Sequence, residues 1–68
     1  MESLELRIFR EAALAKSISK AAANLNYVQS NITAHIRKLE DELGTTLFIR
    51  HGKGVTLTDD GEKLLHYA

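Results

Sequence analysis

The chain has 68 residues, enough for one small domain and too few for a multi-domain enzyme. It has no cysteine, and its three histidines lie far apart in the sequence, so no disulfide, metal or cofactor is expected and stability must come from an apolar core. The chain is neutral overall, has no apolar run of the roughly 18 residues that span a bilayer, and does not begin like a signal peptide. We therefore expect a cytoplasmic protein without a membrane partner.

The spacing of apolar residues predicts a first helix over residues 4–15. Leu4, Ile8 and Ala12 recur every four residues with Phe9 beside them, and the charged residues of this segment fall elsewhere. This is the pattern of an amphipathic helix with one face on the core.

A second, short helix is predicted from about residue 20 to 25. Ser17 and Ser19 are good N-cap residues, and the alanine-rich segment that follows favours a helix and permits close approach by another one. Asn26 can adopt the left-handed backbone that ends a helix where no glycine is available. A turn should follow it.

The best-marked helix is predicted from about Val28 to the residue before Gly44, where a glycine is a common stop signal. Short polar and basic side chains occupy the first part of its exposed face, and the acids at 40–42 lie in its last turns. The apolar stripe that we assign to the core comprises Ile32, Ile36, Leu39 and Leu43.

Two β-rich runs around a glycine-containing turn predict a hairpin over residues 47–57, which must pack on the helices because an isolated hairpin is marginal in water. Thr58 is a natural N-cap for a last helix, whose apolar face begins with Leu64 and Leu65. No capping residue ends this helix, so we expect residues 59–68 to be the start of a longer one.

The charges are separated along the chain. All nine acids lie within residues 2–11, 40–42 and 59–62, whereas residues 12–39 and 43–58 contain six basic residues and no acid. A neutral protein with this distribution can present a positive face.

The order of these elements predicts a mainly α fold of the winged helix-turn-helix class, with three helices, a two-stranded β-hairpin wing and the start of a C-terminal linker helix. In that class the second helix of the helix-turn-helix pair enters the DNA major groove. It needs one apolar face and one face of short polar and basic side chains, because acids would meet phosphates. Residues 29–38 meet both demands.

The sequence closely resembles the N-terminal DNA-binding domain of LysR-type transcriptional regulators, over essentially the whole chain. The combination of matches at these spacings is highly specific, although any one piece would be weak. The matching residues are Phe9, the run 17–22, Gln29, Ile32, Thr33, the run 36–40, Leu43, Gly44, the run 47–50, Leu57, Thr58 and Gly61.

The resemblance implies sequence-specific binding of double-stranded DNA by residues 1–58, with the helix at about 28–43 in the major groove and the wing at 47–57 on the flanking backbone or minor groove. Residues 59–68 would begin a linker helix that forms a homodimer, with a homotetramer as a further option for a full-length protein. A small-molecule effector is expected only for a C-terminal domain that this chain does not contain.

Combining the residues with the resemblance, we predict a set of DNA contacts on the second helix, the third helix and the wing. Ser17 and Ser19 are helix caps first, although a cap can also meet a phosphate. Arg50 and Lys53 could instead be ordinary edge-strand charges, and the helix residues a solvated face. The predicted contacts are Ser17, Ser19, Gln29, Ser30, Asn31, Thr33, Ala34, Arg37, Lys38, Arg50 and Lys53.

Three residues depart from the family's usual pattern. Ser30 stands where a proline is frequent, Ala34 where an arginine often contacts bases, and His35 where a non-titrating polar residue is usual. The DNA sequence preference of a typical member is therefore not transferable to this chain.

Two other classes of function were weighed against DNA binding. No nucleophile and base pair, metal-ligand set or phosphate-binding glycine loop can be assembled, so an enzyme is not expected. A winged-helix module for protein–protein docking is the stronger rival, with Tyr27 as its one candidate aromatic anchor. The acid-free stretch at 12–39 favours DNA.

Overall fold

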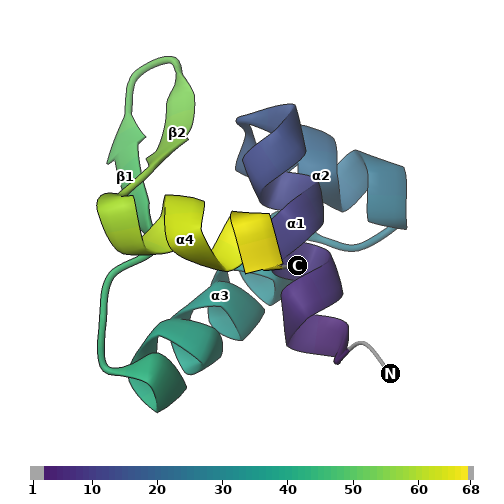
Figure 1. Ribbon diagram of the computed structural model, residues 1–68. Helices are drawn as coiled ribbons and strands as arrows, with labels where there is room; N and C mark the ends of the chain where they lie inside the picture. Colours follow the sequence, from purple (N-terminus) through teal and green to yellow (C-terminus); the bar gives the residue numbers. More distant parts are fainter. Residues whose placement is uncertain (1–2, 68) are drawn as a thin grey trace.

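The computed structural model describes residues 3–67 and arranges them as helices around a small hairpin (Figure 1). Its elements are α1 (Leu4–Ala15), α2 (Ile18–Leu25), α3 (Gln29–Leu43), β1 (Phe48–His51), β2 (Gly54–Leu57) and α4 (Asp59–Tyr67). The predicted mainly α, winged helix-turn-helix class is confirmed. Glu2 of the first acidic cluster and Ala68 of the last predicted segment lie outside the described residues.

The core lies where α1, α2 and α3 pack together and the hairpin joins them. Ile8, Phe9, Ile32 and Leu47 are fully buried, and the rings of Phe9 and Phe48 lie 5.3 Å apart, so one aromatic contact ties the helices to the wing. Small side chains keep the helices close, as predicted for the second helix. The buried alanines of α1 and α2 are Ala12, Ala13, Ala21 and Ala22.

The helix α2 begins two residues earlier than predicted. Ser17 has an extended backbone, and its hydroxyl accepts a hydrogen bond from the amide of Lys20 at 3.2 Å, so it is the N-cap. Ser19 therefore lies inside the first turn, and the prediction that it caps the helix is wrong. At the other end, Asn26 takes the left-handed backbone (φ 60°) as predicted.

The helix α3 follows the predicted pattern except at its last apolar position. Val28 is its N-cap residue, without a side-chain cap, and Gly44 ends it with φ 67°. Leu43 is 50% exposed, and Leu4 at the start of α1 is 44% exposed. Both were predicted to face the core, and both lie outside it. Helical spacing places both on the apolar faces, but these faces extend past the end of the core.

The wing is fixed to the turn between α1 and α2. β1 and β2 pair antiparallel, with Phe48 opposite Leu57 and His51 opposite Gly54. The amide of Val55 donates to the carbonyl of Lys16 at 3.2 Å. Gly54 has φ 133°, and a Cβ there would lie 2.3 Å from the same carbonyl oxygen, so this strand approaches the turn too closely for any side chain.

The helix α4 starts as predicted and packs more closely than predicted. The Thr58 hydroxyl accepts from the amide of Gly61 at 3.0 Å, which confirms the cap. Leu64 and Leu65, which begin the predicted apolar face, are partly buried against the core, and Tyr67 is 92% exposed. Only the last of these three therefore provides a large uncovered apolar surface.

Candidate nucleic-acid interface

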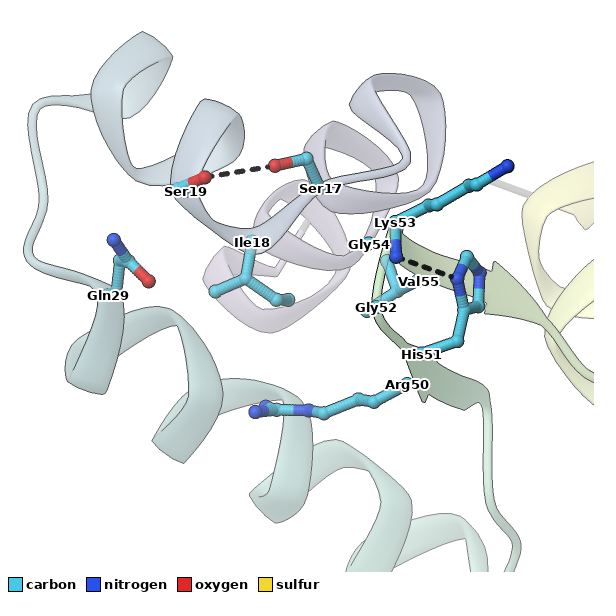
Figure 2. A pocket seen from close by; sticks show the side chains of 10 residues that line it. All are labelled: Ser17, Ile18, Ser19, Gln29, Arg50, His51, Gly52, Lys53, Gly54 and Val55. Atoms are coloured by element: carbon cyan, nitrogen blue, oxygen red, sulfur yellow. Dashed lines mark hydrogen bonds between the residues drawn. The ribbon is translucent and has the colours of Figure 1, made fainter.

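One groove lies between the wing and the first turns of α2 and α3 (Figure 2). It brings together residues from three separate segments of the sequence, and no acidic side chain of residues 3–67 lines it. Five of the predicted DNA contacts are among its lining residues, namely Ser17, Ser19, Gln29, Arg50 and Lys53.

The α2 side of the groove carries two hydroxyls. The Oγ atoms of Ser17 and Ser19 lie 3.1 Å apart, and the first of them also accepts from the Lys20 amide (Figure 2). The amides of the first turn of a helix attract anions, and the hydroxyls add further donors at the same place. This edge of the groove can therefore receive a phosphate group.

The exposed face of α3 continues from the groove. Ser30, Asn31, Ala34, Arg37 and Lys38 are exposed, as is Gln29 at the helix start. These side chains are short and polar in the first turns and basic in the next ones, and acids begin only at position 40. The surface therefore has the chemistry that a major-groove helix requires.

Arg50 connects the wing to α3. Its Nη2 atom donates to Oγ1 of Thr33 at 2.9 Å, and Figure 2 shows the side chain reaching from β1 across to the helix. Thr33 is half-buried, whereas its neighbours on this face are exposed. Sequence reasoning placed both residues at the interface but missed their contact, because nothing in the local pattern links positions 17 residues apart.

Glu40 has a structural contact that its place in an acidic cluster did not indicate. Its Oε2 accepts from the amide of Leu47 at 2.7 Å and from that of Phe48 at 3.3 Å. The carboxylate thus holds the start of β1 against α3. A hydrophobic position such as 47, directly before a strand, gives no sequence signal for this partner.

His35 lies on the side of α3 that faces α1. Its Nδ1 is 3.2 Å from Oε2 of Glu5, and both side chains are mostly covered. The imidazole therefore does not belong to the exposed face, although its position beside Ala34 suggested proximity to it.

Within residues 3–67, no group of three or more histidine and acidic side chains is placed to hold a metal ion. In the same part of the chain, none of the helices has the length and apolar character needed to cross a membrane.

A winged helix-turn-helix with an acid-free groove beside the second helix of the pair defines a class of nucleic-acid-binding domains. The family model described as a bacterial regulatory helix-turn-helix protein of the lysR family matches residues 4–62. The chain belongs to this family, and it corresponds to the DNA-binding domain of LysR-type transcriptional regulators rather than to an enzyme.

Relatives and solved structures agree with this assignment. The chain is 57% identical over 68 residues to the HTH-type transcriptional regulator YusT of Bacillus subtilis (strain 168), and 55% identical over 67 residues to CzcR of the same organism. It is covered fully in the first case and to 98% in the second, but it spans only 23% of the length of either relative.

Two similar structures are complexes with DNA. The CbnR DNA-binding domain in complex with DNA has a TM-score of 0.93 and 34% identity, over 98% of this chain and 77% of that one. The BenM DNA-binding domain in complex with catB site 1 DNA has a TM-score of 0.92 and 34% identity, over 98% of this chain and 74% of that one.

Proposed function

We propose that this chain binds double-stranded DNA in a sequence-specific manner, as the DNA-reading domain of a transcriptional regulator. The observation that carries the proposal is the groove between the wing and the helix N-termini, which gathers predicted contacts from α2, α3 and the hairpin without one acid. The DNA complexes of the CbnR and BenM domains support it.

In this proposal the first half of α3 enters the major groove and reads base edges, while the wing lies on the flanking backbone or minor groove. Phosphate contacts set the position of the domain on the duplex, and contacts to base edges supply the specificity. The proposed DNA-facing residues are Ser17, Ser19, Gln29, Ser30, Asn31, Thr33, Ala34, Arg37, Lys38, Arg50 and Lys53.

The proposal extends to assembly and location. Residues 1–58 form the DNA-binding unit, and residues 59–68 begin a linker helix that pairs with its counterpart in a homodimer in the cytoplasm. One domain covers few base pairs, and a dimer that spans two half-sites about 10 base pairs apart gains interface. A version of the protein with a longer last helix should therefore form dimers in sedimentation equilibrium, and a monomer under conditions of DNA binding would refute this assignment.

The DNA proposal can be tested by salt dependence. If Arg37, Lys38 and Lys53 approach phosphates, each alanine variant should bind specific and random duplexes more weakly. The decrease of log affinity with log salt concentration should also become less steep by about 1 in each variant. Lys63 on α4 lies outside the groove, so Lys63→Ala is the matched control and should keep the parent slope. Unchanged slopes in the Arg37, Lys38 and Lys53 variants would show that these side chains do not form a DNA-binding basic face.

Docking to another protein is the second candidate, because two adjacent apolar side chains are exposed in the turn before α3. Tyr27 is 37% exposed and Val28 is 66% exposed. Exposed aromatic and apolar side chains can anchor a protein partner. A Tyr27→Ala, Val28→Ser double variant tests whether this patch takes part in DNA binding. If it binds DNA with the parent's salt dependence, DNA binding belongs to the groove and not to this patch.

A further inference from the structure

We propose that Arg50 is a specificity-determining residue that acts through Thr33, by fixing the threonine hydroxyl as a hydrogen-bond donor toward a base edge. The inference rests on the proposed function, since it names what one position of that interface selects. It assigns to a wing residue an effect on base reading by α3.

The geometry behind the inference is the hydrogen bond between the wing and the helix. Arg50 Nη2 donates to Thr33 Oγ1 at 2.9 Å. Arg50 lines the groove that Gln29 borders, and it also lines the hollow formed with Arg37 and Glu40 on the next part of α3. Arg50 is exposed as a residue, and its guanidinium lies across the helix surface.

The chemistry of the pair restricts what Thr33 can offer. A free hydroxyl has one hydrogen to donate and two lone pairs that accept, whereas a guanidinium has only donors. Once a lone pair of Oγ1 is taken by Arg50, the hydroxyl hydrogen must point away from the cation. The second lone pair remains, but the adjacent positive charge makes it a weaker acceptor. The bound positive charge also polarises the O–H bond and makes it a stronger donor.

The base edge that fits such a donor is an acceptor. In the major groove the O6 and N7 of guanine, the O4 of thymine and the N7 of adenine accept. The N7 of adenine stands beside an amino group, however, and the amino groups of adenine and cytosine donate and would also meet the positive guanidinium. Thr33 should therefore favour a keto base, guanine or thymine, over an amino base on the strand that it faces.

The competing behaviour is that Arg50 leaves Thr33 when DNA binds and pairs only with a phosphate. Replacement of Arg50 by alanine would then weaken binding to all duplexes alike and lower the salt slope by about 1. Base preference would stay the same. The two behaviours thus differ in which measured quantity changes.

The test uses a duplex selected by the parent chain from a random pool, with all four base pairs substituted in turn at every position. The parent should prefer keto over amino bases about fivefold at one position, which is the size of a single hydrogen bond between neutral groups. Arg50→Ala and Thr33→Val should both reduce this preference to less than about twofold at the same position. Thr33→Ser, which keeps the hydroxyl, should retain it.

Two controls make the result specific. Lys53→Ala removes another wing cation without touching Thr33, so it should lower affinity but keep the keto preference. The double variant of Arg50→Ala with Thr33→Val should lose no more preference than either single variant, because both remove one shared interaction. Thermal melting of each variant checks that the fold is retained. If Arg50→Ala melts early, it is replaced by Arg50→Met, which has a long side chain but no hydrogen-bond donor.

A keto preference that survives Arg50→Ala or Arg50→Met in a folded protein would overturn the inference and leave the proposed function intact. A preference lost at a position that Thr33→Val does not affect would overturn it as well. If the parent bound random and selected duplexes equally, the proposed function itself would fail.

Discussion

The two halves of α3 present different surfaces on one continuous helix. From Gln29 to Lys38 the exposed side chains other than Ala34 are polar or basic, whereas the last turn carries the acids at 40–42 and no basic residue. Acids at the negative end of a helix dipole are unfavourable, so a local contact must offset their cost. Glu40 supplies one by accepting hydrogen bonds from the amides of Leu47 and Phe48 at the start of β1.

This difference shows how a neutral chain can serve an anionic partner. The acids that balance the net charge are clustered along the chain, and none of those in the described residues lines the groove. For recognition, the distribution of charge along α3 therefore matters more than the total.

The largest expected effect comes from removing the contact that the second half of α3 makes with the start of β1. Glu40→Ala leaves the amides of Leu47 and Phe48 without their acceptor, and we expect it to lower the free energy of unfolding by about 2–3 kcal/mol. Glu42→Ala is the matched control, because it removes an exposed acid from the same turn and should change stability by less than about 0.5 kcal/mol. Urea denaturation of both variants measures the difference.

The same variants also separate stability from recognition. A folded Glu40→Ala protein below its unfolding transition should keep the parent's preference at the base pair that Gln29 reads, since the carboxylate does not line the groove and lies at the other end of α3. Equal stability of the two variants would show that the carboxylate does not hold β1 in place.

A smaller effect is expected from the first half of the helix. Gln29 is exposed at the edge of the groove, and a glutamine can pair with adenine through two hydrogen bonds. Gln29→Ala should therefore relax the preference at one base pair by about 1–2 kcal/mol without changing stability. Competition binding with substituted duplexes measures this, and uniform weakening across all sequences would instead assign Gln29 to the backbone.

Local patterns were sufficient to predict the elements of this fold. The spacing of apolar residues, the capping role of Thr58 and the stop at Gly44 all depend on neighbours within one or two turns, and the structure confirms them. The exposure of Leu4 and Leu43 was missed because periodicity defines a face but not where the core stops.

The candidate site was predictable as a set of residues but not as a geometry. Gln29 and Lys53 were identified from charge, side-chain type and resemblance, and both line the groove. The bond from Arg50 to Thr33 and that from Val55 to Lys16 depend on how the wing folds back on the helices. Such contacts between distant segments leave no periodic signal in the sequence.

The smallest expected effect comes from adding a base-contacting side chain to the first half of α3. Ala34 is exposed on the face that continues from the groove, so a longer side chain has room there. Ala34→Arg should create a new preference for guanine worth about 1 kcal/mol at one position, because arginine donates to both O6 and N7 of that base. Ala23→Arg adds the same charge to an exposed position of α2 outside the groove, and should strengthen binding without selecting a base. The test is to compare the sites that the two variants and the parent select from random DNA. A guanine gained only with Ala34→Arg would place this face of α3 against the bases, whereas identical sites for all three proteins would show that this face does not contact the bases.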